Sequence, residues 1–389
     1  MEIHQKHDHQ QPKDLPGVLV VKPPPPLTLF GDKFVSEKFK LLKAWESLLP
    51  LEEFLISNSQ SIQAILCSGA SPVTPDILRL LPSLRLVVTA SAGLNHINLP
   101  ECHRRGITVT NSGNVFSDDC ADAAVGSLID VWRKVSAADR YVRQGLWMTR
   151  GDYALGSKNS FFRAKLNRFF VIISIKRLEF EYLKAKSNVK RTQACFLKSK
   201  IVVKRNGLLV DDLNHQLGGK RVGIVGLGRI GLEVAKRLEA FGCTILYNSR
   251  KEKPVSYTFY SNICELAANS NALIICCGLT DQTRHMIDRQ VLLALGKKGV
   301  IVNIGRGPII DEKELVRCLV EGEIGGAGLD VFENEPNVPQ ELFALDNVVM
   351  SPHSAAFTTE SFIALCELVV GNLEAFFSDK PLLSPVTDD

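Results

Sequence analysis

Short apolar runs rich in β-branched residues alternate with amphipathic helical patterns along most of the chain, and this alternation occurs twice. Runs of the first kind predict strands, and apolar residues at 3–4 spacing predict helices. In the first series we expect strands at Gly17–Val21, Ala64–Ser68, Leu84–Ser91 and Ile107–Asn111, with helices at Asp32–Leu49 and Thr74–Leu81. A longer helix, roughly Ser117 to Gln144, follows them.

The second series begins near Lys220 and has the same alternation. Its expected strands are Arg221–Gly226, Thr244–Asn248, Ala272–Cys277, Val300–Ile304, Gly328–Val331 and Val348–Ser351. Its expected helices are Ile230–Gly242, Asn262–Ala268, Arg289–Leu295, Glu312–Glu321 and Thr359–Phe377. Strands that alternate with helices form parallel sheets covered on both faces. The sequence therefore predicts an α/β protein with two doubly wound parallel-sheet domains and a ligand-binding cleft between them.

Residues 159–216 follow neither series. They mix aromatic and basic clusters, such as Phe161-Phe-Arg163, without a sustained period of 2 or 3.6. They also interrupt a join, from Gly156-Ser-Lys158 to Leu217-Gly-Gly-Lys220, that would be continuous without them. A loop of this length inside a compact unit is rare, so we interpret the segment as an insertion, or as translated non-coding sequence, and not as a domain. The alternative is an element that binds nucleic acid or a membrane surface.

The net charge of +4 belongs to this segment and not to the predicted fold. Residues 159–216 contain 13 Lys and Arg with four acids, whereas the rest of the chain holds 33 basic and 38 acidic residues. The whole-chain charge therefore gives no reason to expect a nucleic-acid partner. No apolar run reaches the roughly 18 residues of a membrane span. Because the N-terminus shows no signal or transit pattern, we expect a cytoplasmic protein.

The ten cysteines are scattered along the chain and form no Cys-x-x-Cys pair. Cys276 and Cys277 lie inside an apolar run, where thiols behave as small hydrophobic side chains. We interpret all ten as reduced thiols and expect no metal site.

Residues 221–231, with the sequence RVGIVGLGRIG, combine a predicted strand, a Gly-x-Gly-x-x-Gly turn and the start of a helix. Gly226 permits the tight turn, Gly228 lets the backbone approach a pyrophosphate, and Gly231 allows the helix to pack on the strand. The helix N-terminus supplies N–H donors and a positive dipole end. The pattern predicts a dinucleotide site that includes the loop residues Arg229 and Ile230.

The end of the next expected strand carries Ser249, Arg250 and Lys251, and no acid. A site selective for NAD usually places Asp or Glu there to accept a hydrogen bond from the ribose 2′-OH. Small polar and cationic side chains can instead hold a 2′-phosphate through charge-assisted hydrogen bonds. We therefore expect NADPH to be preferred, with NADH as a weaker alternative.

Three residues of the second half form a candidate catalytic set: Arg306, Glu335 and His353 each follow a predicted strand. Reduction of a 2-oxo acid needs a cation for the carboxylate and a proton donor for the carbonyl oxygen. The planar fork of Arg suits the first need and the near-neutral titration of His suits the second. Glu335 would orient the imidazole and stabilise its protonated form.

At these residues the sequence resembles the D-isomer-specific 2-hydroxyacid dehydrogenase family, and within it the plant hydroxypyruvate/glyoxylate reductases of the cytosolic, NADPH-preferring type. The resemblance covers nearly all of residues 17–158 and 217–386. It is carried by the glycine loop and by Asn303-Ile-Gly-Arg-Gly307, Gly328-Leu-Asp-Val331, Glu333-Asn-Glu-Pro336 and Ser351-Pro-His353.

The resemblance implies that Arg306, Glu335 and His353 are catalytic and that the Ala92-Gly93 backbone binds the substrate carboxylate together with Arg306. It also implies further cofactor contacts near the nicotinamide and ribose, from Cys277, Thr283, Ile304 and Asp330. The implied reaction is hydride transfer from NADPH to C2 of hydroxypyruvate or glyoxylate, giving D-glycerate or glycolate.

The resemblance further implies a flavodoxin-like substrate domain, residues 1–116 with 352–389, and a Rossmann NAD(P)-binding domain, residues 117–158 with 217–351. Family members are typically homodimers, with the helix near residues 117–144 contributing to the contact. Asn95, the run Ser354-Ala-Ala356 and the segment 159–216 depart from the family pattern.

Two alternatives stay open. One is another enzyme of the superfamily, such as a formate or phosphoglycerate dehydrogenase or an enzyme acting on bulkier aromatic oxo acids. The other is a dinucleotide-sensing scaffold, like the corepressors that share this fold, in which the basic segment would bind a partner.

Overall fold

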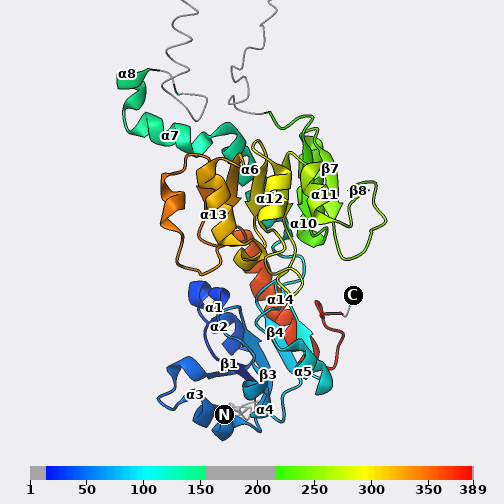
Figure 1. The fold of residues 1–389 in the computed structure, drawn as a ribbon. Coiled ribbons are helices and arrows are strands. Elements are labelled where there is room, and N and C mark those ends of the chain that lie inside the picture. Colours follow the sequence, from blue (N-terminus) through cyan, green and yellow to red (C-terminus); the bar gives the residue numbers. More distant parts are fainter. Residues whose placement is uncertain (1–14, 152, 154–215, 388–389) are drawn as a thin grey trace, which may run out of the picture. The chain divides into compact units, whose positions relative to one another are not determined.

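The computed structural model describes residues 15–151, 153 and 216–387, coloured along the chain in Figure 1. The chain divides into two compact units, one formed by residues 1–131 with 217–389 and the other by residues 132–216. The first unit contains two parallel β-sheets, which confirms the predicted fold class.

The first sheet has five parallel strands in the order β2-β1-β3-β4-β5. This is the strand order of flavodoxin-like folds, as the sequence predicts. The strands are β1 (Gly17–Val20), β2 (Lys40–Lys43), β3 (Ile62–Cys67), β4 (Leu86–Thr89) and β5 (Thr108–Thr110). Their β-branched and leucine side chains are buried almost completely, with Val18, Ile65 and Val87 all at 0 % exposure. Burial on both faces explains why these strands appear as apolar runs in the sequence.

Six helices accompany this sheet: α1 (Pro25–Phe30), α2 (Lys33–Ser36), α3 (Leu51–Asn58), α4 (Pro75–Arg79), α5 (Leu99–Arg104) and α14 (Thr359–Phe377). The last one is contributed by the distant C-terminal segment, drawn in red in Figure 1. It packs on β4, α1 and α2. The ring of Phe377 lies 5.6 Å from that of Phe39, and Lys38 pairs with Glu374 at 2.6 Å.

The prediction of one helix at Asp32–Leu49 is wrong. The structure has a short α2, then the strand β2, then a 3-10 helix at Ala44–Glu46. Strand β2 lies at the edge of the sheet and pairs with β1, and it carries Lys at both ends. Lysines are common on edge strands because they oppose pairing with another chain. Pairing with β1 decides the structure of this segment, although its sequence also suits a helix.

The second sheet has seven parallel strands in the order β12-β11-β10-β9-β6-β7-β8. The strands are β6 (Arg221–Val225), β7 (Thr244–Asn248), β8 (Thr258–Phe259), β9 (Ala272–Ile275), β10 (Val300–Asn303), β11 (Gly326–Leu329) and β12 (Val348–Met350). Counted from β6, this is the Rossmann order with one further strand, and the order reverses between β6 and β9. The edge strand β8 has no counterpart among the expected elements, and β11 begins two residues earlier than expected.

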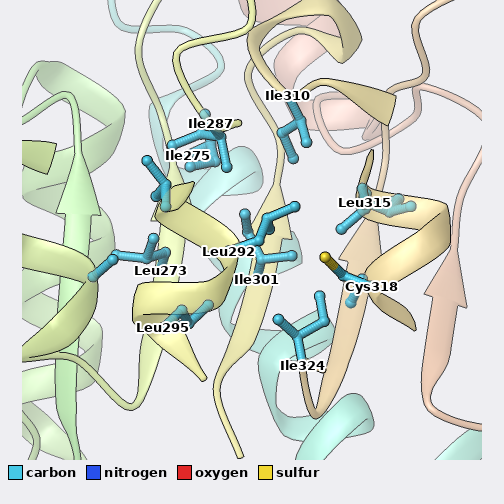
Figure 2. Close-up of a cluster of buried hydrophobic side chains, with 14 of the residues drawn as sticks. Leu273, Ile275, Ile287, Leu292, Leu295, Ile301, Ile310, Leu315, Cys318 and Ile324 are labelled. Carbon is cyan, nitrogen blue, oxygen red and sulfur yellow. The ribbon is translucent and has the colours of Figure 1, made fainter. Parts of the chain in front are cut away.

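The helices of this sheet are α10 (Arg229–Ala240), α11 (Ile263–Ala268), α12 (Arg289–Leu295) and α13 (Glu312–Glu321), with 3-10 helices at Gly307–Ile309 and Gln340–Ala344. Figure 2 shows Ile275, Leu292, Ile301 and Leu315 meeting in one buried cluster of strand and helix side chains. Full burial of each such side chain contributes roughly 1.5–3 kcal/mol. This core fixes the strand ends from which the loops of the site emerge.

The single helix expected from Ser117 to Gln144 is also wrong. It is divided into α6 (Ser117–Arg133) and α7 (Val135–Arg143) at Lys134, whose φ of 53° is left-handed. In the second unit, α7 is followed by Gly145 and α8 (Leu146–Arg150), and the Tyr141 hydroxyl donates to the carbonyl of Gly151 at 2.8 Å. A left-handed residue ends helical hydrogen bonding, which an apolar spacing does not reveal.

The interpretation of residues 159–216 as an insertion lies outside the described residues, apart from Gln216. Within the described ranges, none of the helices has the length and hydropathy that a membrane span requires. The described side chains also include no cluster of three His, Cys, Asp or Glu residues suited to a metal ion.

Candidate active site

The glycine loop lies between β6 and α10, beside the point where the strand order reverses. Gly226 has a φ of 95°, and a Cβ there would lie 2.6 Å from the backbone nitrogen of Cys277. A Cβ on Gly231 would collide with the carbonyl oxygen of Gly226, so the third glycine is needed for the close packing of helix and strand. Gly228 caps α10 and has open space around its Cβ position. The loop therefore fits a pyrophosphate at the N-terminus of a twelve-residue helix.

His353 and Glu335 are joined by a hydrogen bond. The Nδ1 atom of His353 lies 2.8 Å from Oε2 of Glu335, and the other oxygen, Oε1, accepts from the backbone N–H of Phe332 at 3.0 Å. The His353 side chain is 46 % exposed and that of Glu335 36 % exposed, so a ligand can reach the imidazole. His353 also has a φ of 52°, an uncommon conformation for a residue with a side chain, and such conformations gather at functional sites.

Arg306, the third residue of the candidate catalytic set, is positioned by a contact with its own backbone. It follows β10, and its Nη1 donates to the carbonyl of Gly305 at 2.6 Å. Burial lowers the pKa of the Arg306 guanidinium, and the charge of Glu335 opposes that effect. A guanidinium stays charged in proteins, so Arg306 brings a partly desolvated positive charge close to the Glu335–His353 pair.

The loop after β4 approaches the same guanidinium. A Cβ on Gly93 would collide with Nη2 of Arg306, and it would lie 3.3 Å from Oδ1 of Asn95. The Ala92 carbonyl accepts from the side-chain amide of Asn111 at 3.3 Å. The structure therefore brings Gly93, Arg306, Glu335 and His353 together, although they come from sequence positions as far apart as 93 and 353.

Comparison with known proteins agrees with this arrangement. Residues 194–355 match the D-isomer specific 2-hydroxyacid dehydrogenase, NAD binding domain. The chain is 47% identical to glyoxylate/hydroxypyruvate reductase HPR3 of Arabidopsis thaliana, over 96% of this chain and 98% of that one. It is 40% identical to hydroxyphenylpyruvate reductase of Plectranthus scutellarioides, over 95% and 98%. The chain belongs to the D-isomer specific 2-hydroxyacid dehydrogenase family.

A solved structure of the same family shows the likeness in three dimensions. The NADPH-dependent glyoxylate/hydroxypyruvate reductase from Sinorhizobium meliloti, in complex with NADP and malonate, matches with a TM-score of 0.72 and 30% identity. The match covers 96% of this chain and 97% of that one. The resemblance inferred from the sequence motifs is thus confirmed, and with it the class of nicotinamide-dependent oxidoreductases.

The remaining predicted cofactor residues of this dehydrogenase lie just after strands of the second sheet or in the loops that follow them. Cys277 follows β9 and contacts Gly226, and the buried Ile304 follows β10. Thr283 Oγ1 donates to the carbonyl of Gly278 at 2.8 Å, which folds the loop after β9 on itself. The carboxylate of Asp330 is occupied by hydrogen bonds from Ser351, Ser354 and Ala355. Asp330 therefore orders the segment around His353, and its contact with a cofactor stays a prediction.

The other predicted cofactor positions lie at α10 and β7. Ile230 is in the first turn of α10, and Arg229 donates to the Gly113 carbonyl at 3.1 Å. Ser249 follows β7, and its hydroxyl donates to the carbonyl of Lys251 at 2.5 Å. Arg250 and Lys251 are both exposed. The first acid after the strand is Glu252, three positions beyond Ser249.

Sequence reasoning missed two histidines at this site. His285 Nε2 lies 2.8 Å from Glu333 Oε1, and this pair connects the loop after β9 to the loop that carries Glu335. His96 Nε2 lies 2.9 Å from Thr89 Oγ1, behind the Ala92-Gly93 backbone. Neither side chain has a recognisable partner at a fixed spacing, so the sequence offered no signal for either contact.

The geometry of the glycine loop predicts that Gly228→Ala and Gly226→Ala will fail in different ways. At Gly228 the added methyl meets open space in the protein, so the melting temperature should stay close to that of the wild type. The NADPH Kd should rise at least about tenfold, because the methyl occupies the approach of the pyrophosphate.

Gly226→Ala should lower the melting temperature, because its φ of 95° and the Cys277 contact leave no room for a methyl group. Differential scanning fluorimetry and NADPH fluorescence titration measure the two properties. A Gly228→Ala protein that binds NADPH as tightly as the wild type would contradict the proposed use of this loop.

Proposed function

We propose that this chain is a cytoplasmic, homodimeric reductase that uses NADPH to convert hydroxypyruvate and glyoxylate to D-glycerate and glycolate. The observation that carries the proposal is the hydrogen-bonded His353–Glu335 pair beside the partly buried Arg306. The names of the relatives support this choice of substrates: HPR3 and the Sinorhizobium meliloti enzyme are both described as glyoxylate/hydroxypyruvate reductases. The relative from Plectranthus scutellarioides is named a hydroxyphenylpyruvate reductase, so bulkier aromatic oxo acids are the alternative substrates.

Arg306 would bind the substrate carboxylate through its planar fork, together with backbone N–H groups of Ala92 and Gly93. Because Arg306 is partly buried and its Nη2 lies against Gly93, water screens its charge less than at an exposed position. When bound, the reduced nicotinamide supplies the hydride that the substrate's carbonyl carbon receives.

His353 would donate the proton that the substrate oxygen needs as its negative charge develops. Its Nδ1 is held by Glu335, so Nε2 is the ring atom available to the carbonyl oxygen. The carboxylate fixes the ring orientation and stabilises the protonated imidazole before transfer. Arg306 would also stabilise the negative charge that develops on the carbonyl oxygen.

The preference for NADPH is supported by the end of β7. Ser249, Arg250 and Lys251 present a hydroxyl and two cations where NAD-selective enzymes carry an acid. A 2′-phosphate would accept charge-assisted hydrogen bonds from this group. The NADP present in the Sinorhizobium meliloti structure is in line with this preference.

The domain assignment, with residues 1–116 and 352–389 binding the substrate, is supported by the packing of α14 on β4. The homodimer is supported by apolar side chains on the second unit. Trp147 is 59% exposed and Met148 93% exposed on the short helix α8. Large apolar side chains exposed side by side often mark a protein–protein contact.

The first test of the function is NADPH consumption with hydroxypyruvate and glyoxylate by the wild type and by His353→Gln. Loss of the proton donor should lower kcat on the order of 10²–10⁴-fold and leave the NADPH Kd within about twofold. His103→Gln, at an exposed position on α5, is the matched control and should retain full kcat. Equal loss of turnover and NADPH binding would show that His353 is structural, and dinucleotide binding without turnover by the wild type would favour the scaffold.

The cofactor preference is tested by Arg250→Ala. Removing a hydrogen bond to a charged phosphate costs about 1.5–3 kcal/mol, so the KM for NADPH should rise about tenfold or more, whereas the KM for NADH should hardly change. Lys253→Ala, at an exposed cation further along the same loop, should leave both values unchanged. An unaltered ratio of the two KM values in Arg250→Ala would remove the argument for NADPH.

The dimer is tested by light scattering of the double variant Trp147→Ser, Met148→Ser. Aromatic residues at the centre of interfaces commonly contribute 2 kcal/mol or more, so the dimer Kd should rise by roughly thirtyfold. Phe343→Ser removes an apolar side chain that is 64% exposed elsewhere and should leave the dimer intact. A dimer that survives the double variant unchanged would place the interface on another surface.

A further inference from the structure

The loop from Thr89 to His96 is closed by a side-chain contact between its two ends. Thr89 is the last residue of β4 and is buried, and its Oγ1 lies 2.9 Å from Nε2 of His96. Thr89 Oγ1 also accepts from the backbone N–H of Ser91 at 3.3 Å. The hydroxyl hydrogen is then available to an unprotonated Nε2. One hydrogen-bonded contact thus spans the turn that contains Ala92 and Gly93.

Neighbouring loops hold the same turn from both sides. The segment after β3 contributes two backbone donors and the segment after β5 contributes two more hydrogen bonds. These are Gly69 N to Ser91 Oγ at 3.1 Å, Val73 N to His96 O at 2.8 Å, Ser112 N to Ser91 O at 3.2 Å and Asn111 Nδ2 to Ala92 O at 3.3 Å. The turn is therefore fixed at its base, and Gly93 is the part that meets Arg306.

The closing contact adds no charge beside Arg306. Burial, followed by the charge of Arg306, lowers the pKa of His96 to about 4. Burial raises the pKa of the nearby Cys67 thiol, whose sulfur lies 4.0 Å from Nε2, to about 12. At neutral pH both side chains are uncharged. An anion bound by Arg306 therefore meets the charge of the guanidinium without competition or repulsion from the groups behind the turn.

We propose that His96 is a positioning residue which, with Thr89, holds the Ala92-Gly93 backbone against Arg306 as a preformed site for the substrate carboxylate. The inference rests on the proposed function, because the proposed function places the substrate carboxylate between Arg306 and the Ala92-Gly93 backbone. His96 is partly buried and joins the two ends of one turn. Here the contact fixes the turn whose tip lies on the cation.

The effect of losing this contact follows from what the turn does. Without it, the turn keeps its hydrogen bonds to the neighbouring loops but loses the contact between its own two ends. The backbone N–H groups of residues 92 and 93 would then be able to shift relative to the Arg306 guanidinium. A displacement of about 1 Å can cost up to 100-fold in the interactions of a positioned group. Because the same carboxylate contact exists before and during hydride transfer, its loss acts on KM more than on kcat.

The test compares His96→Leu, His96→Gln and Thr89→Val with the wild type and with Asn98→Ala. Gln places an amide near the position of Nε2 and should restore the contact. Asn98 Oδ1 caps α5 by accepting from Glu101 N at 2.9 Å, so Asn98→Ala perturbs the segment just after this loop, away from Arg306. The measurements are the melting temperature, the NADPH Kd, kcat and KM for hydroxypyruvate, and the calorimetric Kd of oxalate for the enzyme–NADPH complex.

We expect His96→Leu and Thr89→Val to raise the hydroxypyruvate KM and the oxalate Kd about tenfold, with kcat within about threefold and the NADPH Kd unchanged. His96→Gln should recover most of the loss. Asn98→Ala should lower the melting temperature and leave both constants alone. Thr89→Val keeps the test decisive if His96→Leu does not fold.

The inference is overturned if oxalate binds both variants as tightly as the wild type, or if Asn98→Ala raises the KM as much as they do. It is also overturned if the wild-type complex does not bind oxalate at all. A wild type that binds oxalate but does not reduce hydroxypyruvate contradicts the proposed function instead, and the oxalate Kd values still decide the role of His96.

Discussion

The carboxylate of Asp330 holds the segment that carries His353 in place. It is 4 % exposed at the end of β11 and accepts from the Ser351 hydroxyl at 2.6 Å and from the backbone N–H groups of Ser354 and Ala355 at 2.9 and 3.1 Å. The carbonyl of the same residue accepts from His353 N at 2.8 Å. A buried carboxylate is tolerated only when it is hydrogen-bonded in this way. The requirement therefore works in both directions: the segment 351–355 satisfies Asp330, and Asp330 fixes the uncommon backbone of His353.

A second constraint brings the cationic side of the site next to it. Gly307 follows Arg306, and a Cβ there would collide with the backbone of Phe332. The loops after β10 and β11 can therefore approach until backbone meets backbone. Phe332 also donates to Glu335, the partner of His353. Parallel strands place such loops at one edge of a sheet. Because Gly307 has no side chain, the two loops can come close enough for the charge of Glu335 to act on the Arg306 guanidinium.

The sequence predicts most of this architecture because both sheets are buried on two faces. Apolar runs then mark the strands, and α12, α13 and α14 begin and end where the patterns indicate. The failures have a different origin. Strand β2 depends on pairing with β1, a partner some twenty residues away, and the break between α6 and α7 depends on the backbone of Lys134. Neither property is carried by hydrophobic spacing.

The same distinction applies to the site. Arg306, Glu335 and His353 could be predicted because they stand in short motifs after strands. His96 could not, since its partner Thr89 belongs to the strand before it and is recognisable only once the turn between them is folded.

The two histidines of the site show how local environment separates their chemistry. His353 is half-exposed and its partner is the carboxylate of Glu335, so a ligand can reach its imidazole. His96 is partly buried beside a cation and its partner is a hydroxyl, and its lowered pKa keeps it neutral. A carboxylate in the place of Thr89, behind the Ala92-Gly93 turn, would compete with a bound anion for Arg306. The hydroxyl of Thr89 can hold the turn without that competition, and the positive charge of Arg306 is left for the carboxylate that we propose it binds.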